Sequence, residues 1–533
     1  MSSLTGTPTL VRLALRRDRV RLPVWVLSFG LMMVYATNAM AALYPTAHDR
    51  QLRAMLMSNP AAVMMSGPGY GTDDYTLGAM IANELALTLV VASSIMSILL
   101  VVRHSRGEEE SGRAELLRAG ATGAYAPLTA ALVVAVVANV GVGSVQLAAM
   151  IAAGLAPVDS AVLALAMALV SLVFAGLTAV CVQVAASARS ATGAGLALLA
   201  AAFAIRAVGD VRSQGGSTLS WFSPIAWMHQ LRPFVELRWW PLLLMAGLAL
   251  AGVTVAYALL RRRDLGAGFL PARAGRRTAP AGLSSPLGLM WRLQRGTCCA
   301  WAVALGLMFA ASGSLVQTVA DSIAEMPPNV VRLLALDDDD LVSGYTAVLV
   351  TFAGLAVGAY AVSSVLRLRG EEQSGRTEQA LSAPVSRRRW LASALGITAL
   401  AATGLLTLAG AALGLTAALA TGRWGWLPRL TGASLAVLPA VLVLVGLAAA
   451  LYGLRSSAAV LAWAVVAYTV GVGLFGGLFD LPGWVLDLSP FHVLPRLPAE
   501  PVSWAALLGL TGVGLVLALV GDRLFRRRDL TAG

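Results

Sequence analysis

Long apolar stretches, each about 20 residues or more, recur along the whole chain and are separated by short polar segments. A stretch of that length crosses the roughly 30 Å hydrocarbon core of a bilayer as one α-helix. A transmembrane β-barrel would instead show segments of about ten residues with alternating polarity, and the sequence contains none. The pattern therefore predicts an all-α, polytopic membrane protein.

Hydropathy indicates about 12 transmembrane helices, arranged as two sets of six. The first set is expected near residues 23–43, 79–102, 126–153, 158–186, 190–208 and 240–260. The second set is expected near residues 298–318, 342–366, 390–420, 430–453, 456–480 and 503–523.

Short polar motifs recur at a nearly constant distance. RGEEESGRAE at 106–115 returns as RGEEQSGRTE at 369–378, which is 263 residues later. The pairs RS (189–190 and 455–456), SP (223–224 and 489–490) and RRRDL (261–265 and 526–530) return after 266, 266 and 265 residues. These markers predict tandem halves, 1–260 and 285–533, joined by an Arg- and Pro-rich cytoplasmic linker, 261–284. Since each half has an even number of spans, the halves share an orientation and a pseudo-two-fold axis along the membrane normal.

The arginines set the expected orientation. RLALRRDRVR precedes the first span, RRRDLGAGFLPARAGRR follows the sixth, and RLFRRRDL ends the twelfth. Arg-rich flanks favour the cytoplasmic side, so both termini and the loops 106–118 and 369–389 are predicted to be cytoplasmic. Segments 44–78, 209–239, 319–341 and 481–502 then face outward. The expected location is the bacterial plasma (inner) membrane.

Composition agrees with this architecture. The chain is 58% hydrophobic and 12% charged, whereas a soluble domain carries about a quarter of charged residues. The net charge of +12 does not indicate nucleic-acid binding, because the arginines lie against span ends. Cys181, Cys298 and Cys299 lack metal-ligand spacing, so no metal site is predicted.

The repeated acidic phrase is the main functional signal. Gly112 and Gly375 are expected to end the preceding span and to open short helices near 112–119 and 375–382. One interpretation is that the carboxylates only neutralise neighbouring Arg103, Arg106, Arg367 and Arg369. Because the spacing as well as the charge is duplicated, the favoured interpretation is a docking element for a two-fold symmetric cytoplasmic partner.

This loop resembles the coupling-helix loop of ABC transporter type-2 permeases (type V exporters), which has the form EExxGRxExLL…PVSR between the second and third spans. The fused double length resembles the polyketide-antibiotic (tetronasin-type) and multidrug export subfamily. The second copy, RGEEQSGRTEQALSAPVSRRRWLAS, matches throughout, whereas the first departs after Leu117 and lacks PVSR. The resemblance implies docking of an ATPase through Glu108, Glu109, Arg113, Glu115, Glu371, Glu372, Arg376 and Glu378.

The resemblance also implies further elements. Residues 1–22 and 285–296 would form interfacial helices that enter each half. Segments 217–234 and 483–495 would form short membrane-dipping helices between the fifth and sixth spans, with Trp221, Trp227 and Trp484 at the outer interface.

The chain contains no lysine, so it cannot contain a standard P-loop, whose Lys contacts the nucleotide phosphates. It is therefore predicted to be a transport subunit without an ATPase site or a cofactor of its own. ATP and Mg would be bound by a separate homodimeric ATP-binding cassette subunit on the cytoplasmic face. The predicted function is export of hydrophobic or amphipathic compounds, such as drugs and antibiotics.

Two polar residues inside predicted spans are candidates for the substrate path. Glu84 is a contact for cationic substrate, a gate, or a partner of Arg206, and these readings stay open. Gln146 favours interhelical hydrogen bonding. Arg206 and Asp210 are expected to face the outer interface.

Two other functions are alternatives to export. An ion-coupled secondary transporter also has two six-span halves, but it needs intramembrane ionisable groups, and Ala347 stands where the second half would need a counterpart of Glu84. A membrane-embedded glycosyltransferase would use a catalytic carboxylate on an outward loop, and the run Asp337–Asp340 is the candidate for it. The favoured interpretation of this run is a solvated group of charges.

Overall fold

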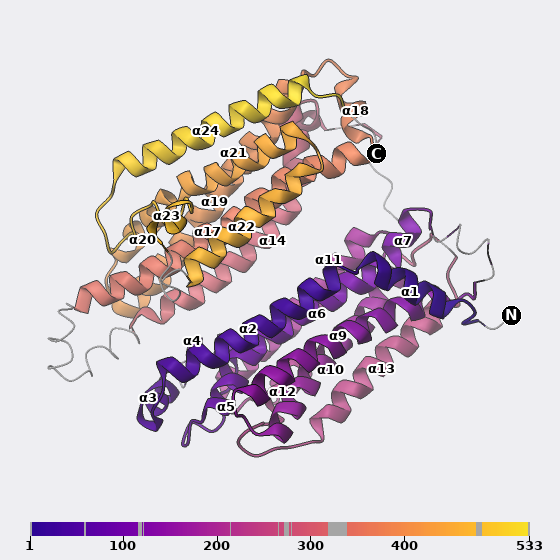
Figure 1. Ribbon diagram of the computed structural model, residues 1–533, viewed down its shortest axis with the longest axis vertical. Helices are drawn as coiled ribbons and strands as arrows, with labels where there is room; N and C mark the ends of the chain where they lie inside the picture. The colour runs from indigo at the N-terminus through magenta and orange to yellow at the C-terminus, as the bar shows by residue number, and fades with distance from the viewer. Residues whose placement is uncertain are drawn as a thin grey trace. The chain divides into compact units, whose positions relative to one another are not determined.

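A computed structural model describes residues 3–57, 60–113, 115, 120, 122–213, 215–264, 266–270, 277–278, 280–317, 338–475 and 482–530. The chain forms two compact units, Met1–Gly275 and Arg276–Gly533, each a bundle of long helices (Figure 1). The described residues form helices, turns and loops without a β-strand, as the hydropathy pattern predicts.

The first unit contains the following elements in chain order: α1 (Thr7–Arg17), α2 (Arg21–Leu43), α3 (Ala47–Met57), α4 (Pro60–Ser66), α5 (Leu77–Met80), the π-helical turn η1 (Ile81–Leu85), α6 (Ala86–Arg103), α7 (Arg106–Glu110), α9 (Ala126–Ala152), α10 (Pro157–Val184), α11 (Ala188–Arg212), the 3-10 turn η2 (Ser220–Phe222), α12 (Pro224–His229) and α13 (Pro241–Leu260).

The second unit contains the 3-10 turn η3 (Ala281–Leu283), α14 (Pro286–Ser314), α17 (Asp338–Gln373), α18 (Arg376–Leu381), α19 (Arg387–Thr421), α20 (Trp426–Ala436), α21 (Leu438–Leu454), the 3-10 turn η4 (Ala458–Leu461), α22 (Ala462–Phe475), α23 (Gly483–Asp487) and α24 (Trp504–Arg527).

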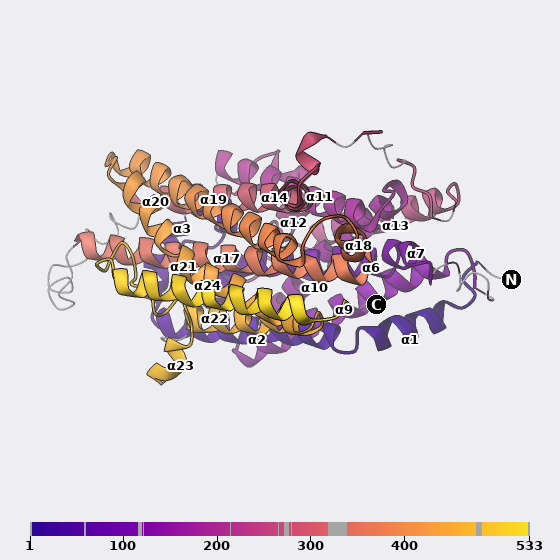
Figure 2. The same ribbon diagram turned by 90° about the horizontal axis from the view of Figure 1, so that it is seen from above.

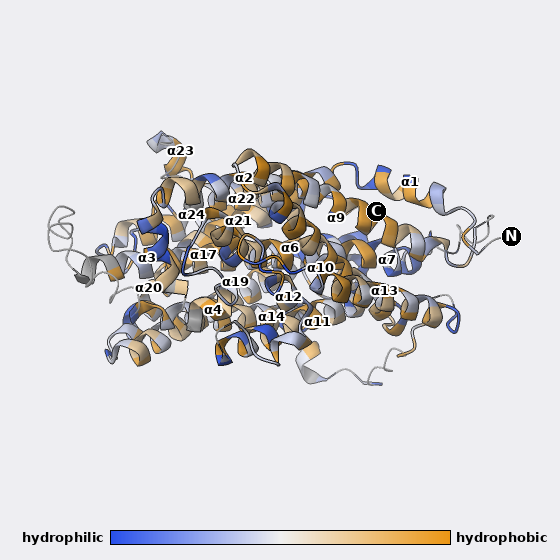
Figure 3. Cartoon of the chain, turned by 90° about the horizontal axis from the view of Figure 1, so that it is seen from below, coloured by the Kyte–Doolittle hydropathy of each residue, from blue (hydrophilic) through white to orange (hydrophobic). Residues whose placement is uncertain are grey.

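The predicted spans coincide with helices of this fold. Within the described residues, 11 helices are long and apolar enough to cross a membrane, and a shorter apolar helix, Ala458–Val472, stands at the eleventh predicted span. Apolar residues cover most of the long helices, while hydrophilic residues gather in connecting segments (Figure 3). The chain is therefore a polytopic membrane protein of about 12 spans.

Both units pack their spans in the same order. Figure 2 shows the long helices of both units from above. The first span contacts the third, and the fourth contacts both the second and the sixth. In the first unit these contacts are α2 with α9, and α10 with α6 and α13; in the second they are α14 with α19, and α21 with α17 and α24. The two units therefore share one packing order among these spans, and the division into tandem halves 1–260 and 285–533 stays a prediction.

Glycines bring the fourth and sixth spans together in each unit. A Cβ on Gly176 would lie 2.7 Å from the carbonyl oxygen of Ala249. In the second unit, a Cβ on Gly453 would lie 2.4 Å from the carbonyl oxygen of Gly521. Small residues at such positions let helix backbones approach closely in a bilayer, where packing rather than the hydrophobic effect drives helix association.

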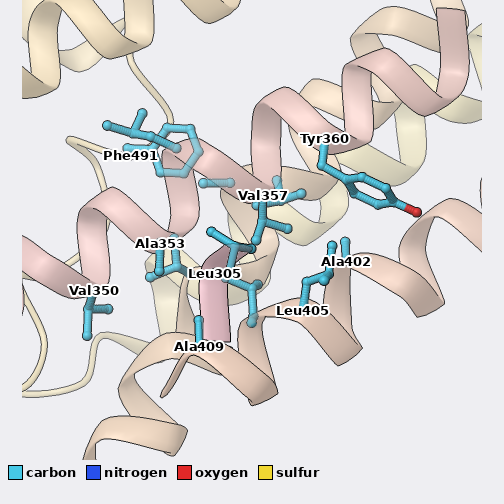
Figure 4. Packing of buried hydrophobic residues seen from close by; sticks show 14 of the residues in the cluster. Leu305, Val350, Ala353, Val357, Tyr360, Ala402, Leu405, Ala409 and Phe491 are labelled. Carbon is cyan, nitrogen blue, oxygen red and sulfur yellow. The ribbon is translucent and has the colours of Figure 1, made fainter. Parts of the chain in front are cut away.

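The core of the second unit shows how the remaining spans meet. Leu305 of α14, Val357 of α17 and Leu405 of α19 are 2%, 0% and 2% exposed, and their side chains converge (Figure 4). Phe491, from the segment that precedes the sixth span, closes the same cluster. The loop before the sixth span is thus anchored to the bundle.

The interfacial elements differ between the units. In the first unit α1 is a separate helix that ends at Arg17, before the first span begins at Arg21. In the second unit α14 runs unbroken from Pro286 to Ser314, so the residues expected to form an interfacial helix, 285–296, are continuous with the first span, and their place at the interface stays a prediction. The short helices expected between the fifth and sixth spans are present as η2, α12 and α23.

Candidate functional site

The two acidic phrases contain the same backbone turn. Gly112 and Gly375, which are 263 residues apart, adopt φ angles of +72° and +71°. Their amides donate to the carbonyls of Glu109 (3.1 Å) and Glu372 (2.9 Å). Only glycine adopts this left-handed conformation without strain, so each glycine ends the preceding helix and turns the chain, as the sequence predicts.

A short helix follows this turn in the second unit. It is α18, and it begins directly after Gly375, which confirms the prediction for 375–382. The corresponding prediction for 112–119 falls largely outside the described residues, among which only 112, 113 and 115 belong to that stretch.

Glu109 and Glu372, at equivalent positions of the repeat, each pair with an arginine of their own unit. Arg263 binds Glu109 through two contacts, Nη2 to Oε1 at 2.5 Å and Nη1 to Oε2 at 2.9 Å. Arg528 binds Glu372 through Nη1 to Oε1 and Nη2 to Oε2, both at 2.8 Å. Side-chain exposure is 15% for Glu109 and 2% for Glu372. These bidentate pairs join the two repeated motifs, the acidic phrase and RRRDL, inside each unit.

Glu108 and Glu371 are the second equivalent pair of carboxylates. Glu371 accepts two hydrogen bonds from Arg376, at 2.7 and 3.0 Å. Glu108 lies 4.0 Å from Arg113 and also pairs with Arg17 of α1 at 2.5 Å. The hydrogen bond and charge of Glu371 raise the pKa of Arg376. Each acidic loop thus contains an ion pair between a carboxylate and an arginine of its own phrase.

Among the described residues of each loop are an arginine and a glutamate with exposed side chains, at equivalent positions of the repeat. Arg113 and Arg376 are 58% and 57% exposed at their side chains, and Glu115 and Glu378 are exposed as well. These four residues are available to a partner, whereas Glu109 and Glu372 are engaged internally. Of the neighbouring arginines named in the neutralising interpretation, Arg106 binds Glu109 at 2.5 Å, whereas Arg103 pairs with Asp18.

The PVSR segment present only in the second copy has a structural contact. Arg387 donates to the carbonyls of Arg526 (3.2 Å) and Arg528 (2.5 Å), and so binds the carboxyl end of α24. In the first unit, the chain before the third span pairs instead with the amino-terminal segment, through Gly123 N to Thr5 O (2.9 Å) and Tyr125 N to Ser3 O (3.0 Å). The two copies therefore hold the start of the third span differently: through Arg387 and the end of α24 in the second unit, and through the amino-terminal segment in the first.

Sequence reasoning missed a buried ionic cluster beside the first loop. Asp18, at the end of α1, is fully buried and lies 2.5 Å from His104 and 3.2 Å from Arg103, both at the end of the second span. In the sequence, Asp18 lies among arginines and looks like a residue that only balances their charge. No local motif therefore indicates that it is buried and paired. The cluster fixes the junction of α1 and α2 to the second span.

The family of this chain follows from comparison with known proteins. Residues 8–261 and 283–526 match the family described as multidrug efflux system permease Rv1217c, C-terminal domain. The multidrug efflux system permease protein Rv1217c of Mycobacterium tuberculosis (strain ATCC 25618 / H37Rv) is 38% identical over 539 residues, covering 99% of this chain and 96% of the relative. The chain belongs to this permease family.

Glu84 of the permease lies in the π-helical turn η1 of the second span, a local distortion often found at functional sites. Its carboxylate binds Arg53 of α3 at 2.7 and 3.1 Å, and it accepts a hydrogen bond from Tyr75 at 3.1 Å. Pairing with Arg206, one of the open readings, is therefore wrong. Contact with a cationic substrate stays a prediction.

Arg206 and Asp210 of the permease form a buried ion pair at 3.2 Å, with Ser220 donating to Asp210 at 2.6 Å. Both side chains are inaccessible to solvent, so the expectation that they face the outer interface is wrong. The reason is that α4 and η2 cover the end of α11. Arg206 is bound there by the carbonyls of Val63 and Met64.

Gln146 is 1% exposed, and neither its amide nitrogen nor its amide oxygen has a hydrogen-bond partner among the described residues. The expected interhelical hydrogen bond is therefore not formed. A role in the substrate path stays a prediction. The acidic run considered for a glycosyltransferase begins with Asp337, which lies outside the described residues.

Proposed function

We propose that this permease is the membrane subunit of an ATP-driven exporter that moves hydrophobic or amphipathic compounds, including drugs, out of the cell. Membership of a multidrug efflux permease family supports transport as the activity. The observation that supports an ATP-driven mechanism is that both loops expose the same two charged residues. These are Arg113 and Glu115 in the first loop and Arg376 and Glu378 in the second.

The proposed partner is a homodimeric ATP-binding cassette subunit on the cytoplasmic face. Two equivalent charged surfaces on one chain suit a partner with two-fold symmetry, and charges at the rim of an interface mainly set register and association rate. ATP and Mg belong to that subunit, because a chain without lysine cannot supply the phosphate-binding lysine of a P-loop. We place the complex in the plasma (inner) membrane, with both termini of the permease in the cytoplasm.

In this mechanism the cassette dimer closes on ATP and displaces both loops together. Each loop is continuous with the second span and leads into the third, so its displacement changes the packing of spans within a unit. A ligand shifts such an equilibrium only through different affinity for the two states, so the drug must bind one state of the path better than the other.

Co-purification tests the proposal directly. The tagged permease is expressed together with candidate cassette subunits from neighbouring genes, and the purified membrane fraction is assayed for ATPase activity. We expect a cassette subunit to co-purify and transport into inverted vesicles to require ATP. Transport that continues without ATP but stops when the proton gradient is dissipated would instead support the secondary transporter.

A double substitution tests the docking surface. We expect Glu115→Ala combined with Glu378→Ala to lower complex yield and drug-stimulated ATPase, because both exposed carboxylates are lost, while insertion into the membrane is unchanged. The matched control is Glu236→Ala with Glu500→Ala, which removes one carboxylate from each half on segments predicted to face outward. Equal complex yield in the two double variants would contradict a docking role.

A further inference from the structure

The bidentate pairs Glu109–Arg263 and Glu372–Arg528 connect the residues just after the second span to those just after the sixth. In the second unit Arg387, at the far end of the same loop, also binds the carboxyl end of α24. Glu109 lies in α7, which follows the second span, and Arg263 lies three residues beyond the sixth span. Glu372 lies in the last turn of α17, and Arg528 directly follows α24. Each pair therefore links the start of a coupling loop to the end of the sixth span.

Helix packing alone does not provide this link. In both units the sixth span packs chiefly on the fourth, through the glycines described above. Across the described helices, α6 and α13 are not packed along each other, and neither are α17 and α24. A displacement of the coupling loop would therefore reach the sixth span most directly through the ion pair.

The position of the pairs in the repeat argues against a chance surface contact. The two carboxylates are 372 − 109 = 263 residues apart, and the two arginines are 528 − 263 = 265 residues apart. Arg263 and Arg528 are only 4% and 13% exposed at their side chains, so solvent screens these pairs less than exposed ones. Both geometries use the two-pronged match of guanidinium and carboxylate, which lysine cannot reproduce.

We propose that these two ion pairs transmit the movement of each coupling loop to the sixth span, so that Glu109, Arg263, Glu372 and Arg528 are positioning residues for transport. The inference rests on the proposed ATP-driven function. Loss of a pair leaves the exposed Arg and Glu of the loop in place, and therefore leaves docking intact. It removes the link between the start of the loop and the sixth span, while Arg387 of the second unit still binds the carboxyl end of α24, so ATP hydrolysis continues and less drug is moved per ATP.

The test compares four variants in the full chain bound to its cassette subunit, reconstituted in vesicles: Arg528→Gln, Arg528→Lys, Glu372→Arg combined with Arg528→Glu, and Arg526→Gln. The probe is ethidium or acridine orange, whichever the wild-type complex transports. Complex yield, ATPase rate and dye transported per ATP hydrolysed are measured separately. Arg526→Gln is the control, because Arg526 pairs with Asp522 within α24 alone, at 3.2 Å.

We expect Arg528→Gln to reduce dye transported per ATP several-fold at unchanged complex yield, Arg528→Lys to be intermediate, and the charge-reversed double variant to recover part of the loss. Arg526→Gln should match the wild type. Transport that falls only in proportion to complex yield, with dye per ATP unchanged in every variant, would overturn the inference and leave the pairs with a structural role. Failure of the proposed function is distinguishable, since no cassette subunit would then bind the wild-type chain.

Discussion

At the scale of single residues, the charged groups within the bundles are explained by the partners that they find. Glu84 binds Arg53 and Tyr75, and Arg206 binds Asp210. A charge inside a membrane protein is expensive unless it is paired or faces water. The hydropathy of the spans correctly indicates that Glu84 needs a partner. Span hydropathy cannot identify Arg53 as that partner, because Arg53 lies in a polar helix outside the spans and hydropathy does not predict how such a helix packs.

Breaking the Glu84 pair should reveal its contribution. We expect Arg53→Gln to destabilise the permease by about 1–3 kcal/mol, because it leaves a buried carboxylate with one hydrogen bond from Tyr75. Thermal unfolding in detergent, followed by tryptophan fluorescence, measures this change. Adding Glu84→Gln to Arg53→Gln should recover part of the lost free energy of unfolding. If the loss in the double variant equals the sum of the losses in the two single variants, the two side chains act independently.

At the scale of elements, the short helix α18 depends on the turn that precedes it. The sequence predicts α18 and the glycine before it, because helix termination at Gly is a local property. The partners of Glu109 and Glu372 were not predicted, since Arg263 and Arg528 belong to motifs more than 150 residues away in sequence whose approach depends on tertiary packing. Local signals therefore predicted the helix, but not which face of the loop is free.

Gly375 provides a test of this element. A Cβ at Gly375 would meet nothing within 4 Å, so Gly375→Ala introduces only backbone strain of roughly 1–2 kcal/mol from the left-handed conformation. We expect lower thermal stability and weaker drug-stimulated ATPase, and a milder effect for Gly375→Asn, because Asn tolerates this conformation better. Gly425→Ala is the control, since Gly425 has ordinary helical φ and equally open space. Equal effects of Ala at 375 and 425 would contradict this account.

At the scale of the whole molecule, hydropathy and motif spacing predicted most of the fold. The twelve spans coincide with helices because apolar length is a strong signal, and the repeat offset anticipated the shared packing order. The sequence did not predict the short helices α3 and α4 or the uninterrupted α14. Neither polar connecting segments nor the continuity of a helix has a sequence signal as strong as the apolar length of a span.

The orientation of the whole chain can be tested by labelling. In a variant with Cys181, Cys298 and Cys299 replaced by Ala, single cysteines are introduced as Ser111→Cys or Asp487→Cys, both at exposed positions. We expect a membrane-impermeant maleimide to label Asp487→Cys in intact spheroplasts and Ser111→Cys only in inverted vesicles, because arginine-rich flanks favour the cytoplasm. The opposite labelling would reverse the assignment of the coupling loops to the cytoplasm.

The first half of the chain does not end where its sixth span ends. After α13, Arg263 binds Glu109, and the amides of Phe269 and Leu270 donate to the carbonyls of Gln183 and Val184, at 3.4 and 3.0 Å. RRRDL therefore closes the first bundle as it closes the second. A version of the permease expressed as two polypeptides would therefore keep these contacts of the first bundle only if the break came after Leu270.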